Sequence, residues 1–230
     1  MTGWAEYALA LVVFIASHFL PRLGGLRERL IAALGRRAYF SLYGLLSTAL
    51  LVWLVSAAVR APYVELWPQL PWARWVPNIA MPLAVCLVTC GIGLRQPYTL
   101  GGRRGVALDP AQPGFAAISR HPLFLALALW AGAHLFPNGD LAMVLLFGSF
   151  TLMALLAIPA FDARARRALG ADATPFFGST ALMSLRPLAR AGWRRRNGRA
   201  LALRLAAGLA LWLALLHLHA AVIGASPFPL

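Results

Sequence analysis

The chain has 230 residues, of which 60% are hydrophobic and only 12% are charged, and its mean hydropathy is +0.71. Soluble domains carry about a quarter charged residues, so this composition excludes a disordered chain and disfavours a water-soluble fold. The net charge of +14 arises from 21 arginines, without any lysine, against 7 acidic residues. An integral membrane protein explains both features, since arginines in short loops meet anionic headgroups, and we expect no nucleic-acid binding.

Six segments are apolar and close to the roughly 20 residues that a helix needs to cross a bilayer. We therefore predict an all-α fold, a bundle of about six transmembrane helices in a single membrane domain over residues 1–230. A cytoplasmic amphipathic segment, 162–199, precedes the last helix. In chain order the predicted helices are Trp4–Leu20, Ala38–Val59, Val76–Leu94, His121–Pro137, Leu141–Phe161 and Ala200–Ile223.

The first predicted helix follows neither a basic stretch nor a small-residue cleavage site, so we expect no signal peptide. Arginines are distributed unevenly over the connections. Eighteen lie in the first, third and fifth connections, as five, four and nine, whereas two lie in the second and fourth. Because arginine-rich loops stay in the cytoplasm, we predict a multi-pass protein of the bacterial inner membrane with both termini in the periplasm.

All five histidines lie in or at the edge of a predicted helix, where a polar side chain is costly and usually functional. Neutral imidazole ligates haem iron, and a helix bundle with inward-facing histidines can hold haem b. At a rise of 1.5 Å per residue, His18 and His121 lie at similar depths in the membrane, as do His134 and the pair His217 and His219. By depth alone, one haem iron would bind His18 and His121, or His134 with His217 or His219. For the last two, an interhelical hydrogen bond or an interfacial position is the alternative.

The short polar motif before the fourth predicted helix contains Arg120 and His121. These two side chains suit an anion or the phosphate or carboxylate of a cofactor, and helix capping is the alternative. Cys86 and Cys90 lie four positions apart on one helix face, so a disulfide framework is excluded. We interpret them as small packing residues, with metal or redox chemistry as the alternative.

Several motifs resemble the NnrU family of bacterial membrane proteins, which includes the plant 15-cis-ζ-carotene isomerase. The first is Ser119–Pro122 followed by Trp130 and His134, with the histidines of this stretch 13 positions apart. The second is Ser17–Arg22 at the end of the first predicted helix. The resemblance covers roughly residues 10–190, and the extra C-terminal helix, 200–223, carries little of it.

The resemblance implies a haem b-binding membrane protein. The two haem ligands of the plant isomerase match His18 and His134, and Arg120 and His121 are further candidates for contacts to the cofactor. That enzyme uses a cysteine three positions before the second histidine as an alternative ligand, where this chain has Ala131, which argues against a ligand switch and isomerase activity. The bacterial members are associated with denitrification and nitric oxide metabolism, so the resemblance implies a role in such a pathway, or a haem-dependent redox or isomerase activity.

Two other classes of function stay open. The Arg-His-Pro motif also resembles isoprenylcysteine carboxyl methyltransferases, which would imply S-adenosylmethionine near Arg120, His121 and Asp162. The paired glutamates of those enzymes are absent here, and only Asp162 remains. The third class is a non-catalytic subunit that assembles or stabilises a respiratory or denitrification complex.

The arginine asymmetry makes the topology testable. A reporter fused after residue 100 should be active in the cytoplasm, and one fused after residue 230 should be active in the periplasm. Paired cytoplasmic and periplasmic reporters at both sites provide the measurement. A periplasmic signal at residue 100 would contradict the predicted orientation.

Overall fold

The computed structural model describes residues 3–103 and 105–228, so Arg104 of the predicted cytoplasmic loop lies outside the described residues. The prediction of an all-α fold is confirmed, since 76% of the chain is helical and the described residues contain no strand. The chain forms two compact units. The first contains residues up to 68 together with 139–146, and the second contains residues 69–138 and those from 147 onward.

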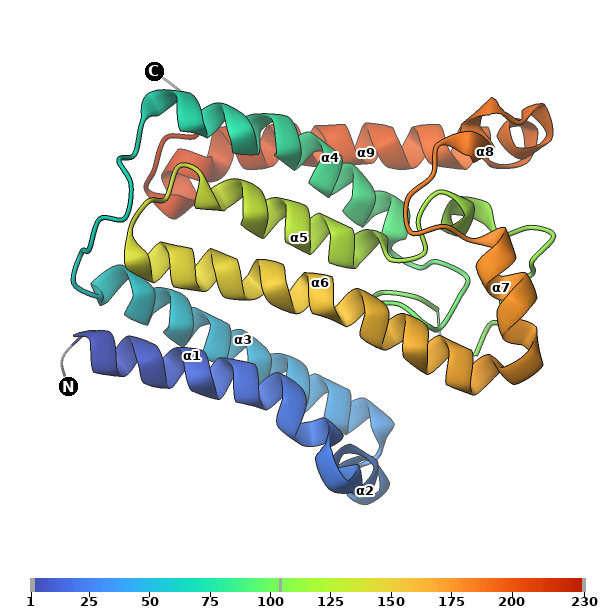
Figure 1. The fold of residues 1–230 in the computed structure, drawn as a ribbon, viewed down its shortest axis with the longest axis horizontal. Coiled ribbons are helices and arrows are strands. Elements are labelled where there is room, and N and C mark those ends of the chain that lie inside the picture. Colours follow the sequence, from blue (N-terminus) through green and yellow to red (C-terminus); the bar gives the residue numbers. More distant parts are fainter. Residues whose placement is uncertain (1–2, 104, 229–230) are drawn as a thin grey trace. The chain divides into compact units, whose positions relative to one another are not determined.

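Three helices form most of the first unit: α1 (Gly3–Phe19), α2 (Leu26–Leu34) and α3 (Arg36–Arg60) (Figure 1). A 3₁₀ turn at Leu20–Gly25 separates α1 from α2, and the chain bends there by 74°. Gly24 and Gly25 have φ values of +58° and +71°, which only glycine adopts without strain. The long apolar first segment therefore ends at this turn.

Polar contacts join the elements of the first unit. Glu6 of α1 accepts hydrogen bonds from Trp53 Nε1 (3.3 Å) and Arg60 Nη2 (2.5 Å) of α3. The hydroxyl of Tyr7 donates to the main-chain oxygen of Ala142 in the first turn of α6 (2.8 Å). Gly139 approaches Trp67 so closely that a Cβ would lie 2.0 Å from its carbonyl oxygen, and its own carbonyl accepts from the Trp67 amide (3.2 Å).

The second unit is built on four helices: α4 (Trp75–Gly91), α5 (Pro122–Leu135), the part of α6 (Leu141–Leu169) that follows residue 146, and α9 (Ala191–Ile223). Helix α4 packs on both α5 and α9 (Figure 1). The short helices α7 (Ala173–Ser179) and α8 (Arg186–Ala189) follow α6, after Gly170 with φ +55° ends that helix. This end of the unit carries the candidate site.

Arg204 of α9 caps the C-terminal end of α4. Its Nη1 donates to the main-chain oxygens of Thr89 (3.0 Å), Cys90 (2.9 Å) and Ile92 (2.9 Å). These carbonyls have no partner within a helix that ends at this point, and a cation there also complements the helix dipole. These hydrogen bonds stabilise the charge of an arginine that lies within a largely apolar helix.

The two cysteines lie on the face of α4 that meets α9. Cys90 is buried, and Cys86 lies against Gly208, where a Cβ would come within 3.0 Å of its Sγ. Small residues allow this close approach of two backbones, as in membrane helix pairs generally. The position agrees with a packing role for both cysteines.

All six predicted segments contain helices, but the structure does not confirm the number of membrane spans. Within the described residues, four helices are long and apolar enough to cross a bilayer, or five if the bent pair around residue 20 counts as one span. At 14 residues α5 is about 21 Å long, which is shorter than the hydrocarbon layer. The predicted positions of the termini relative to the membrane remain a prediction.

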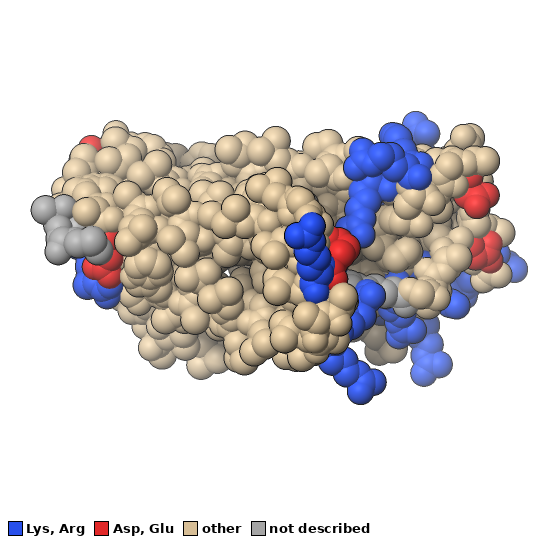
Figure 2. All heavy atoms as spheres, turned by 90° about the horizontal axis from the view of Figure 1, so that it is seen from below, with Lys and Arg blue, Asp and Glu red and all other residues tan. Residues whose placement is uncertain are grey.

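The surface has the character of a membrane protein. Only 6% of the most apolar stretch of α9 is buried, although it consists mainly of leucine and alanine. Figure 2 shows a face on which uncharged residues cover most of the area and charged side chains interrupt it in a few places. Such an apolar surface is stable in lipid and not in water, so the chain is a multi-pass membrane protein.

The contact at Gly208 can be tested with two matched substitutions in α9. Gly208→Ala places a methyl group 2.7 Å from Thr89 Oγ1, and we expect it to destabilise the protein by about 1–3 kcal/mol. Gly198→Ala meets no atom within 4 Å and should stabilise it by up to about 1 kcal/mol through helix propensity. Thermal unfolding in detergent measures both, and equal midpoints would contradict close α4–α9 packing.

Candidate functional site

An ion pair joins the beginning of α5 to the later part of α6 in the second unit. Arg120 donates from Nε to Oδ1 of Asp162 (2.9 Å) and from Nη2 to Oδ2 (2.5 Å). This is the bidentate fork that guanidinium and carboxylate form best. Both side chains are only 14% exposed, so the pair is shielded from water and depends on both partners.

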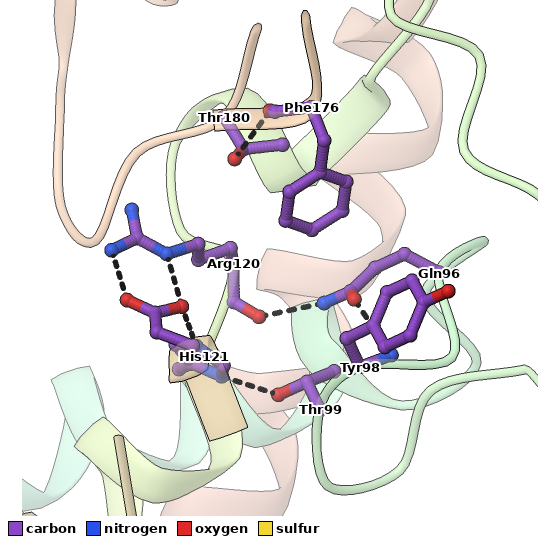
Figure 3. A network of polar contacts seen from close by, with 8 residues as sticks. Gln96, Tyr98, Thr99, Arg120, His121, Phe176 and Thr180 are labelled. Carbon is purple, nitrogen blue, oxygen red and sulfur yellow. Dashed lines mark hydrogen bonds and ion pairs between the residues drawn. The ribbon is translucent and has the colours of Figure 1, made fainter. Parts of the chain in front are cut away.

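His121 lies beside this pair, at the N-cap of α5, and is 1% exposed. Its Nε2 lies 2.8 Å from Oδ1 of Asp162, and its Nδ1 lies 3.0 Å from Oγ1 of Thr99 (Figure 3). The ring is buried, and its neutral form has one N–H donor and one acceptor nitrogen. A carboxylate only accepts, so Nε2 donates to Asp162 and Nδ1 accepts from the Thr99 hydroxyl.

The loop after α4 is anchored to the same network. The side-chain amide of Gln96 donates to the main-chain oxygen of Arg120 (2.8 Å), and its oxygen accepts from the Tyr98 amide (3.0 Å) (Figure 3). Gln96 is fully buried, which is unusual for a glutamine and requires that both ends of the amide are bonded. The loop thus has one defined conformation at the mouth of α5.

Main-chain hydrogen bonds attach the segment before α5 to the segment after α7. The Arg120 amide donates to the oxygen of Ala181 (2.7 Å), and the Ser184 amide donates to the oxygen of Ile118 (2.8 Å). The ring of Phe177 in α7 lies under two guanidinium groups, at 5.2 Å from Arg120 and 3.9 Å from Arg166. Cation–π contacts of this kind add to the fixed position of Arg120.

The sequence predicted Arg120, His121 and Asp162 as groups around a cofactor, and the structure brings these three together. Their polar atoms bond one another and Thr99, so both ring nitrogens of His121 and both oxygens of Asp162 are already used. The arrangement therefore locks α5 to α6 and leaves His121 no nitrogen for a metal. The sequence did not predict that Gln96 and Thr99 belong to this network, because the residue type of a polar loop residue does not show whether it is buried.

The other four histidines share a different geometry. In each, Nδ1 lies within hydrogen-bond distance of a main-chain oxygen, which can only accept, so Nδ1 carries the proton. Nε2 is then the nitrogen with a free lone pair, the form in which histidine ligates iron, and the carbonyl orients the ring. The pairs are His18–Phe14 (2.8 Å), His134–Trp130 (2.7 Å), His217–Leu213 (2.8 Å) and His219–Ala225 (2.8 Å).

Of these four, His134 contacts aromatic rings of both α5 and α6. Its ring stacks on Phe147 of α6 with centroids 5.2 Å apart and lies 5.8 Å from the ring of Trp130. His219 belongs to the same unit as His134. His18 belongs to the other unit. The described residues hold no group of three or more histidine, cysteine or acidic side chains, but haem iron needs only one or two protein ligands.

Comparison with known proteins identifies the family. The family model described as "NnrU protein" matches residues 6–227, nearly the whole chain and including the last helix. The chain therefore belongs to the NnrU family. A search of curated proteins and a search of solved structures found no match.

The ion pair predicts a specific sensitivity to its carboxylate. Asp162→Asn leaves the shielded charge of Arg120 without a partner, and we expect a loss of about 3–5 kcal/mol in stability. Asp172→Asn makes the same chemical change at an exposed position and should cost less than about 0.5 kcal/mol. Thermal unfolding in detergent measures both variants. If they unfold at the same temperature, the Arg120–Asp162 pair does not hold α5 and α6 together.

Proposed function

We propose that this NnrU-family membrane protein binds haem b and that His134 provides an axial ligand to the iron. The observation that carries the proposal is the tautomer of His134. Its Nδ1 donates to the Trp130 carbonyl within an apolar helix, which leaves Nε2 as the iron-binding atom. Haem, when bound, would supply redox chemistry or an open coordination position for a small ligand.

The residues around His134 suit a flat apolar group. Helix α5 has no charged residue between Pro122 and Leu135, and Trp130 contacts two phenylalanines of α6, Phe147 and Phe150. Aromatic rings of this kind line haem and other apolar ligand sites. An aromatic surface beside a histidine with a free Nε2 is the combination that a porphyrin needs.

The second axial ligand has two candidates. The family resemblance pairs His134 with His18, whereas His219 belongs to the same compact unit as His134. The Nδ1 atom of each donates to a main-chain oxygen, so the Nε2 atom of each is free to bind iron. His121 is not a candidate, since Asp162 and Thr99 occupy both of its ring nitrogens.

The geometry gives less support to a methyltransferase. Arg120, His121 and Asp162, the groups that would bind S-adenosylmethionine, already form hydrogen bonds with one another. Binding the methyl donor there would require breaking an ion pair that holds two helices. A role in nitric oxide or nitrite respiration, which the resemblance implies, would require that a small ligand can replace one of the two axial ligands.

The haem proposal predicts a Soret band in the protein purified in detergent from cells with ample haem. His134→Ala should abolish or shift the band, because it removes the ligating Nε2. The control is His217→Ala, since His217 has the same carbonyl contact in a more exposed position and should leave the spectrum unchanged.

Two further variants identify the second ligand. A changed spectrum in His18→Ala would support the pairing implied by the resemblance, and a changed spectrum in His219→Ala would support the pairing within the second unit. Addition of nitric oxide to the ferrous protein then shows whether one position is exchangeable. A colourless wild-type protein, or a His134→Ala variant with an unaltered band, would overturn the proposal.

A further inference from the structure

An apolar groove runs between α4 and α5 in the second unit. Its volume is about 250 Å³, and its walls are successive turns of the two helices. The α4 wall begins at Met81 and ends at Val88, and the α5 wall begins at Leu123 and ends at Trp130. Both sets follow the helical repeat, so the groove is a continuous strip parallel to the helices.

The groove ends at the loop that follows α4. Leu100 of this loop lines the groove, and Gly101 approaches Leu123 so closely that a Cβ would lie 2.7 Å from its Cδ2. Two main-chain hydrogen bonds close the loop into a hairpin: Gly93 N to Gly101 O (2.9 Å) and Arg103 N to Leu94 O (2.7 Å). The hairpin that bounds the groove therefore also carries Arg103.

The charges at this end of the groove are uncompensated. Arg95 and Arg103 are both exposed, and neither forms an ion pair among the described residues. The acid of the same connection, Asp109, accepts a hydrogen bond from the main-chain amide of Ala111. Arg120, the third described arginine of the connection, is already paired with Asp162.

We propose that this groove and hairpin form a binding site for an anionic phospholipid of the surrounding bilayer. One acyl chain lies along the apolar strip between α4 and α5, and the headgroup phosphate binds Arg95 and Arg103. The occupant follows from charge complementarity, because an apolar groove that ends at a hairpin with two exposed, unpaired arginines fits a molecule with one long apolar part and one anionic end. The proposal does not depend on haem binding.

Native mass spectrometry of the full chain tests the proposal, after reconstitution in equal amounts of phosphatidylglycerol and phosphatidylcholine. The wild-type protein should retain phosphatidylglycerol preferentially. Arg95→Gln/Arg103→Gln should weaken that retention roughly ten- to thirtyfold, given the strength of arginine–headgroup attraction. The control Arg195→Gln/Arg196→Gln removes the same charge from exposed positions of α9 and should leave retention unchanged.

The apolar half of the site has its own variant. Leu127→Trp fills the groove and should reduce retention of both lipids. Leu152→Trp alters a more exposed leucine of α6 outside the groove (57% against 41%) and should not. Unfolding temperatures within a few degrees of wild type confirm that each variant is folded. Equal retention of the two lipids by the wild type, or equal effects of the two arginine pairs, would overturn the proposal.

Discussion

The pairing of Arg120 with Asp162 holds the polar end of the second unit together. Because the guanidinium binds both carboxylate oxygens, α5 begins at a fixed height on α6. Oδ1 of the carboxylate also accepts from Nε2 of His121, whose Nδ1 bonds Thr99 of the loop after α4. One acidic side chain of α6 therefore orders both the loop around Thr99 and the start of α5 at Arg120 and His121. A chain with only seven acidic residues has few alternative partners for this arginine.

The lipid environment explains why polar atoms elsewhere form hydrogen bonds with nearby groups of the same chain. Water cannot satisfy a donor at membrane depth, so each must find a partner within the chain. Arg204 bonds three carbonyls at the end of α4, and His134 bonds the carbonyl one turn before it. In the histidines this local bond has a chemical consequence, since it assigns the proton to Nδ1 and leaves Nε2 for a ligand. His121 is the exception, because its partners are side chains on both sides.

The arginines thus have different roles, although their distribution in the sequence indicates only the topology in the membrane. Arg120 is held by a carboxylate, and Arg204 by main-chain oxygens. Arg166 lies over the ring of Phe177. Others, such as Arg95 and Arg103, stay unpaired among the described residues and are available to headgroups. Positive charge in this chain is therefore partly structural and partly directed to the membrane surface.

The sequence by itself determined the fold class, the membrane character and the family, because apolar runs form helices whatever they contact and short motifs identify relatives. It also predicted the helix Leu141–Phe161, which the structure extends to Leu169, where Gly170 with φ +55° ends it. Only the tertiary structure decided that Asp162 binds Arg120 and His121, at separations of 42 and 41 positions, and that the buried Gln96 belongs to the same network. Hydropathy measures how each residue partitions into lipid, whereas the choice of partner depends on how the helices pack, and no single segment contains that information.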